Sequence, residues 1–163
     1  MAIYNLEEKD SFTVFGIGTE LTSHYTDFAG INKEKADFWQ AVSQDGRLDS
    51  LKAIATNDYV FIVNEAVNNK MMHYAGVMTE AVAPELGETE TRIIQFPKGE
   101  YLVVKGDGNT IDELCNKVTG IAFGQSLQEA NDIAYVGGPN AAVVMEQRNG
   151  VFYGEMLIPV VRK

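Results

Sequence analysis

The chain has 163 residues, of which 45% are hydrophobic and 22% are charged, and its formal net charge is −10. Such a composition is typical of a soluble globular protein, and no apolar run reaches the roughly 20 residues that a membrane span needs. The acidic balance without a basic cluster argues against direct binding to DNA or RNA, whose phosphates require Lys and Arg. The N-terminus has no apolar signal-peptide core, and a single cysteine, Cys115, excludes an internal disulfide. We therefore expect a cytoplasmic protein.

The first half of the chain, about residues 10–82, predicts a strand, a helical region and two further strands. Residues 12–21 are rich in β-branched and aromatic side chains, as strands are. Asn32 is the expected N-cap of the helix and Gly46 its expected end. The expected elements are a strand at 12–21, helices over 32–46 and 47–54, and strands at 59–63 and 72–78 joined by a polar turn at 68–70.

The second half, residues 91–163, follows an acidic linker at 83–90 and repeats this order. Thr110 and Glu113 form a capping box, which marks the start of a helix, and Asn149-Gly150 is a hairpin turn signal. The expected elements are strands at 92–96 and 101–105, a helix from 111 to 122, and a closing hairpin of 141–146 and 151–160.

Both halves therefore share the order βαββ, and we expect a single α+β domain over 1–163. When the closing hairpins are overlaid, Tyr74 matches Tyr153 and Gly76 matches Glu155. At this position of the overlay, a glycine of the first half corresponds to a carboxylate of the second.

Glu155 lies in the middle of an otherwise apolar and aromatic strand. Burying an ionised carboxylate without a partner is costly, so this residue is a candidate for function. Strand alternation places Tyr153, Glu155 and Leu157 on one face, which we expect to line a groove while the other face packs on helices. Desolvation of Glu155 suits either the counter-charge of a cation or a general base acting on water.

Three segments resemble the GyrI-like family, which includes effector-binding domains of AraC-type and MerR-type multidrug regulators. Residues 95–104 (QFPKGEYLVV) resemble its (I/F)PAGxYAVF segment, and residues 155–160 (EMLIPV) resemble its closing E-x-x-IP(V/L) signature. Residues 36–40 (ADFWQ) are similar to its (I)PxLWxxF helix. The matches span nearly the whole chain in the family's order.

The resemblance implies a pseudo-twofold duplicated βαββ fold, with an antiparallel sheet and a central ligand groove between the halves. It also implies binding of bulky aromatic or cationic lipophilic compounds by Glu155 and aromatic residues. Together with the strand alternation and the hairpin overlay, the resemblance gives the expected ligand-binding residues Trp39, Tyr74, Tyr101, Tyr153 and Glu155. The chain carries no helix-turn-helix extension, so we do not expect a transcription factor.

Three functions remain open at this point. The protein either sequesters xenobiotics, or hydrolyses them, or inhibits a partner protein. Hydrolysis would open the cyclopropane ring of DNA-alkylating natural products, with Glu155 as general base and Tyr101 as its catalytic partner. We expect no cofactor and no metal, because His24 and His73 are far apart in sequence and lack a nearby ligand cluster.

Overall fold

The computed structural model describes residues 4–24, 26–79 and 91–163. The helices are α1 (Phe28–Gln44), α2 (Arg47–Ile54) and α3 (Ile111–Ile121), which continues into a π-helical turn (Ala122–Ser126) and a short α4 (Leu127–Glu129). The strands are β1 (Asn5–Lys9), β2 (Phe12–Leu21), β3 (Val60–Val67), β4 (Lys70–Met78), β5 (Thr91–Phe96), β6 (Gly99–Gly108), β7 (Ile133–Tyr135), β8 (Asn140–Arg148) and β9 (Val151–Arg162).

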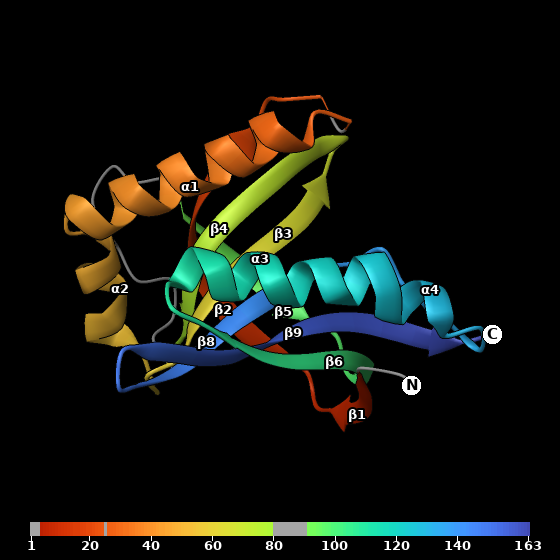
Figure 1. Cartoon of the computed structure of the whole chain (residues 1–163). Coiled ribbons are helices and arrows are strands. Elements are labelled where there is room, and N and C mark those ends of the chain that lie inside the picture. Colours follow the sequence, from red (N-terminus) through yellow and green to blue (C-terminus); the bar gives the residue numbers. More distant parts are fainter. Residues whose placement is uncertain (1–3, 25, 80–90) are drawn as a thin grey trace.

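Within these described residues, the nine strands form one antiparallel sheet with the order β1-β6-β9-β8-β3-β4-β2-β5, and β7 pairs with the end of β9. Figure 1 shows α1 and α3 lying over the sheet, with α2 turned across the end of α1. The predicted α+β fold with a duplicated βαββ order is therefore confirmed.

The pairing of the central strands relates the two halves. Phe61 of β3 pairs with Gly76 on one side and with Val143 of β8 on the other. Val143 in turn pairs with Glu155. Gly76 and Glu155 therefore stand on one row of the sheet, each one strand outward from the central β3–β8 pair, as the overlay of the hairpins predicted.

The two halves also exchange their leading strands. The N-terminal strand β1 pairs with β6 of the second half, whereas β5, which opens the second half, pairs with β2 of the first. Each half thus completes its outer edge with a strand of the other.

The face of the sheet that carries the helices holds a large hydrophobic core, beside a smaller cluster formed by Phe15, Ile17, Leu51 and Val77. Leu114 and Val118 of α3 and Val42 of α1 are buried against alternate residues of the strands. Met156 and Ile158 belong to this core, which confirms the predicted alternation along β9. Burial of such aliphatic side chains contributes roughly 1.5–3 kcal/mol each.

The opposite face holds a second core made largely of aromatic residues. Phe12 of β2 stacks on Phe96 at 4.6 Å between ring centroids and lies 6.1 Å from Tyr101 of β6. Because β2 and β6 are near opposite ends of the strand order, the sheet must curl around this cluster. Leu157 is buried in it, so Glu155 points to the face away from the helices.

Some predicted boundaries are wrong. The N-cap of α1 is Asp27 rather than Asn32, because the Asp27 carboxylate accepts a hydrogen bond from the Gly30 N–H at 3.1 Å. Strand β6 spans Gly99–Gly108, which is longer at both ends than the predicted 101–105. Strands β1 and β7 were not predicted, and the linker at 83–90 lies outside the described residues.

Candidate functional site

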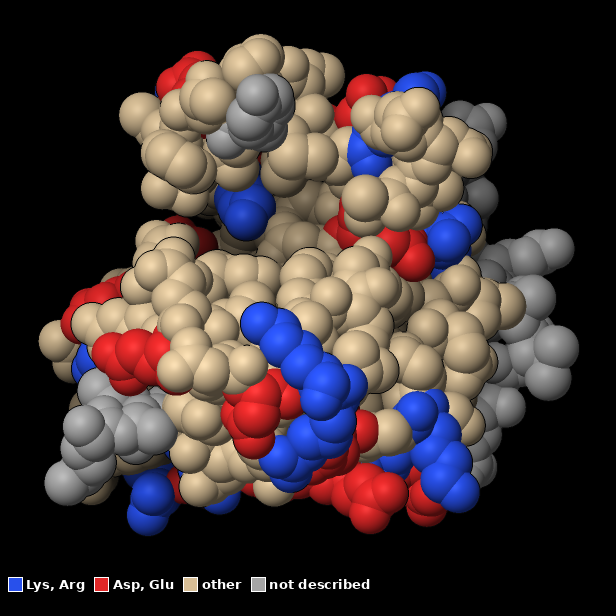
Figure 2. All heavy atoms as spheres, turned by 90° about the vertical axis from the view of Figure 1, so that its right-hand side faces the viewer, with Lys and Arg blue, Asp and Glu red and all other residues tan. Residues whose placement is uncertain are grey.

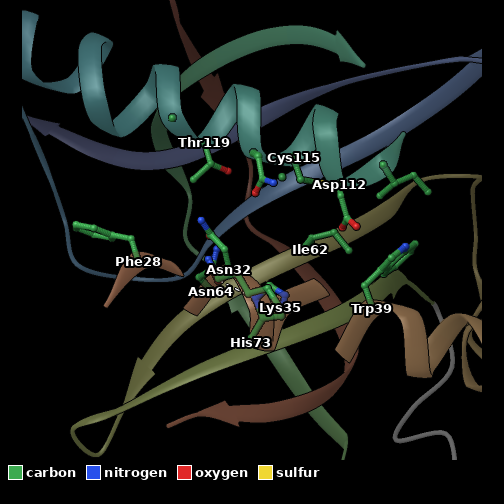
Figure 3. Close-up of a pocket in the computed structure, with 14 residues that line it drawn as sticks. Phe28, Asn32, Lys35, Trp39, Ile62, Asn64, His73, Asp112, Cys115 and Thr119 are labelled. Carbon is green, nitrogen blue, oxygen red and sulfur yellow. Dashed lines mark hydrogen bonds between the residues drawn. The ribbon is translucent and has the colours of Figure 1, made fainter. Parts of the chain in front are cut away.

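A groove lies between α1 and α3, above β3, β4 and β8. Figure 2 shows it as a hollow in the molecular surface with a basic side chain inside, and Figure 3 shows the residues around it. Its inner part has a volume of about 410 Å³, and an adjoining hollow of about 590 Å³ shares five of its residues. We call the inner part the α1–α3 groove; it is lined by Phe28, Asn32, Lys35, Trp39, Ile62, Asn64, His73, Ile111, Asp112, Cys115, Asn116, Thr119, Gly120 and Ala142.

Helical geometry explains how these residues meet. Phe28, Asn32, Lys35 and Trp39 are spaced at i, i+4, i+7 and i+11, so they share one face of α1. The corresponding face of α3 contributes its lining residues from 111 to 120 in the same way. One wall of the groove therefore comes from each half of the chain.

The ends of the groove carry apolar surface. Trp39 and Ile111 are partly buried residues that pack against the helix-side core. Phe28 is 73% exposed and lines both the groove and the adjoining hollow. An exposed aromatic ring at the edge of a concave site is available for contact with a ligand.

A chain of hydrogen bonds lies beneath the groove. The buried His73 ring contacts Asn64 Oδ1 through Nδ1 at 2.8 Å, and Asn64 Nδ2 donates to Asn140 Oδ1 at 3.3 Å. Asn140 Nδ2 donates to the Tyr135 hydroxyl at 3.0 Å, and that hydroxyl donates to the Gly138 carbonyl. Because an amide oxygen only accepts, Nδ1 of His73 carries the proton.

Burial controls the charges in the groove. Desolvation, together with the charge of Lys35, lowers the pKa of His73 to about 3, so this ring is neutral at physiological pH. Desolvation also raises the pKa of Cys115 to about 12, with a smaller contribution from Asp112, so the thiol is not a nucleophile. The pKa of Lys35 is lowered by burial, and that of Asp112 is raised by burial.

Glu155 lies outside this groove. Together with Tyr153 it lines a separate hollow near the β8–β9 hairpin, which Lys105 and Arg148 also border. Glu155 is 6% exposed, and burial raises the pKa of its carboxyl despite the opposing charges of Lys9 and Lys105. The Arg148 guanidinium lies over the Tyr153 ring, with its Cζ atom 4.6 Å from the ring centroid.

The other predicted site residues are placed apart. Trp39 lines the α1–α3 groove. Tyr101 is buried, and its hydroxyl donates to the Pro97 carbonyl at 2.6 Å. Tyr74 is 2% exposed and borders a hollow beside Lys70 and Arg92. The structure thus brings Tyr153 and Glu155 together, places Trp39 in the α1–α3 groove, and buries Tyr74 and Tyr101 in the aromatic core on the other face of the sheet.

The polar residues of the groove were missed by the sequence interpretation. Lys35, Asn64, His73 and Asp112 carry no motif, and they meet only because two helices and two strands converge. The i, i+4, i+7 spacing along α1 and α3 is the signal that would have found the helical ones.

Two absences hold for the residues that the structure describes. They contain no group of three or more His, Cys, Asp or Glu side chains that could hold a metal ion. No helix formed by residues 4–24, 26–79 or 91–163 is long and apolar enough to cross a membrane.

Comparison with known proteins identifies the fold. No curated protein matches the chain. The structure of SAV2435 bound to tetraphenylphosphonium is similar over 97% of this chain and 93% of that one, at 17% identity and a TM-score of 0.74. A putative transcription regulation protein from Staphylococcus aureus matches at 18% identity and a TM-score of 0.71, over 98% of this chain and 99% of that one.

A third match comes from a complex with DNA. In the EcmrR–DNA complex, the EcmrR chain matches at 12% identity and a TM-score of 0.61, over 100% of this chain and 59% of that one. The family model for integron-associated effector-binding proteins, Cass2, matches residues 5–160. The predicted GyrI-like effector-binding fold is therefore confirmed, and the chain belongs to the family of integron-associated effector-binding proteins.

Proposed function

We propose that the protein binds bulky, lipophilic aromatic molecules and holds them in the α1–α3 groove. The observation that carries this proposal is a concave site of about 410 Å³ in which Trp39, Ile62 and Ile111 converge with a few polar groups. Sites of roughly 300–1,000 Å³ that are mostly apolar, with a few placed polar side chains, are typical of small-molecule binding.

The family and its neighbours support this proposal. The family model describes effector-binding proteins. The neighbour SAV2435 was solved with tetraphenylphosphonium, a bulky aromatic cation, so this fold accommodates a molecule of that size. Aromatic contacts of the kind that Trp39 offers contribute about 0.5–1.5 kcal/mol beyond burial.

Trp39 provides the test, because it is the single tryptophan of the chain. Titration with a panel of aromatic dyes should change its fluorescence with saturable binding. Ile62→Phe fills the groove and should weaken binding of the dyes at least tenfold. Ile93→Phe is the matched control, because Ile93 is 52% exposed on the edge strand β5. Equal binding by both variants would place the ligand elsewhere.

The sequence also predicts cationic ligands, for which Glu155 would supply the counter-charge. A buried carboxylate for which the described residues offer no hydrogen bond is a suitable counter-charge for a lipophilic cation. This part of the proposal assigns cations to the Glu155 hollow rather than to the α1–α3 groove. Glu155→Gln should then weaken binding of a cationic dye and leave binding of a neutral dye unchanged.

Hydrolysis is a second candidate, favoured by one observation, the raised pKa of the buried Glu155 carboxyl. A general base with a raised pKa is matched to reaction near neutral pH. The test is mass spectrometry of a cyclopropane-containing alkylator after incubation with the protein. Ring-opened product formed at the same rate by Glu155→Gln would exclude this role.

A further inference from the structure

We propose that Lys35 determines the specificity of the α1–α3 groove, and that the groove selects aromatic molecules bearing a carboxylate or another compact anionic group. This inference rests on the proposed function, because it names the class of ligand for the same groove. It departs from the expectation of cationic ligands that the family resemblance gave.

The position of Lys35 is the first observation. It lines both the groove and the adjoining hollow, and it is the basic residue among the side chains that line them. Figure 3 shows it beside Asn64 and His73, across the groove from α3. Since His73 is neutral, the positive charge at the centre of the groove belongs to Lys35.

The lack of a partner is the second observation. The neighbouring Lys33 on the same helix pairs with Asp37 at 2.7 Å. Lys35 is partly buried and makes no ion pair within 4.0 Å among the described residues. A cation that is partly desolvated and unpaired leaves an electrostatic cost that a bound anion would remove.

The carboxylates of the groove do not neutralise Lys35. Glu65, at the adjoining hollow, already binds Arg92 at 2.9 Å. Asp112, on the opposite wall, forms no ion pair with Lys35 within 4.0 Å among the described residues, and burial rather than Asp112 governs the pKa of Lys35. A ligand carboxylate is therefore the charge that the centre of the groove lacks.

The polar neighbours suit an anion in the same place. Asn32 and Asn116 line the groove from α1 and α3 and supply amide N–H donors. Hydrogen bonds to a charged acceptor are stronger than those between neutral groups. The net charge of −10 opposes the approach of an anion, but surface charges beyond about 8 Å are screened at physiological ionic strength. The ammonium group of Lys35, inside the groove, therefore has a larger effect on a bound anion than these distant surface charges.

The experiment compares three ligands that share one ring system: 1-naphthaleneacetate, its neutral amide, and 2-(1-naphthyl)ethylammonium. Isothermal titration calorimetry with the whole chain should show the carboxylate binding roughly tenfold or more tightly than the amide. Lys35→Met should abolish this advantage while the amide still binds, which shows that the groove is intact. Lys35→Arg should retain it.

Lys33→Met is the matched control and should leave all three affinities unchanged, because Lys33 lies on the same helix but is 76% exposed and does not line the groove. Equal binding of carboxylate and amide, or tighter binding of the ammonium compound, would overturn the inference while leaving the proposed function standing. An advantage of the carboxylate that survives in Lys35→Met would overturn it as well. Failure of all three ligands and of the dye panel to bind would overturn both.

Discussion

Gly76 and Glu155 occupy equivalent positions on one row of the sheet but have opposite surroundings. A Cβ atom at Gly76 would lie 2.7 Å from Val14 Cγ1 and 2.8 Å from the Phe15 carbonyl oxygen. The partner of Glu155 on the outer strand is Lys105, whose side chain reaches solvent. In the first half, the strand backbones therefore leave no room for a side chain at Gly76. At the equivalent place, the second half has room for the carboxylate side chain of Glu155.

Gly76→Ala should destabilise the protein by about 1–3 kcal/mol, because the added methyl group meets a backbone oxygen that cannot move away. Urea denaturation followed by circular dichroism measures the change. Gly120→Ala is the control: no atom lies within 4 Å of its Cβ position on α3. That substitution should leave stability unchanged or raise it by up to about 1 kcal/mol through helix propensity.

Glu155→Gln should stabilise the protein at neutral pH by about 0.5–2 kcal/mol. Burial raises the pKa of the folded carboxyl, so the folded state holds the proton more tightly than the unfolded state. The cost of ionisation is absent below the unfolded pKa of about 4.3 and is complete once the pH exceeds the folded pKa. Thermal denaturation at pH 4 and pH 7 should show a gain at pH 7 only. A loss at both values would indicate that the carboxylate is paired in solution.

His73 should make the protein sensitive to acid. Its folded pKa is lowered from 6.5 to about 3 by burial, so the stability that comes from keeping the ring neutral is present above pH 6.5. That stability is lost as the pH falls from 6.5 toward 3, at roughly 1.4 kcal/mol per pH unit. We therefore measure the free energy of unfolding by denaturation from pH 7 to pH 4. His73→Gln should remove this contribution to its dependence on pH. His24→Gln, at an exposed position, is the comparison, and an equal effect of both would contradict the assignment.

Tyr101→Phe should cost about 1–2 kcal/mol of stability, because the Pro97 carbonyl loses its donor at 2.6 Å. Burial raises the pKa of this phenol to about 12, so the hydroxyl stays protonated and able to donate. Tyr153→Phe retains the ring beneath Arg148 and should change stability by less than about 0.5 kcal/mol. Thermal melts of the two variants make the comparison. A neutral effect at Tyr101 would mean that water replaces the hydroxyl.

Much of the fold could be predicted because its signals are local. The helix over 47–54 was predicted to the residue, and the Asn149-Gly150 turn and the Thr110 cap occur as expected. The sequence favours Asn32 as the cap because it precedes the apolar spacing at 38, 39 and 42, whereas the helix begins after Asp27. The exchange of β1 and β5 could not be predicted from the sequence, because strands that pair across more than 70 residues carry no local signal of their partner.

The candidate site was less accessible to sequence reasoning. The sequence predicts a role for Glu155 because a carboxylate in an apolar strand is conspicuous at any position. The sequence does not indicate Lys35, because a lysine on an amphipathic helix is ordinary unless the structure shows that it faces a groove. Tyr74 and Tyr101 resemble ligand contacts in sequence, but curling of the sheet buries both in the aromatic core.

The exchange of leading strands has a consequence for folding. If the chain were divided between its halves, each fragment would lose the neighbour of an outer strand, and β2 or β6 would present an unpaired edge. Unpaired edges promote association with other chains. Neither fragment should therefore behave as an independent unit, and the molecule should unfold in one cooperative transition. An effector bound between α1 and α3 would accordingly protect the whole chain from unfolding, rather than a single half.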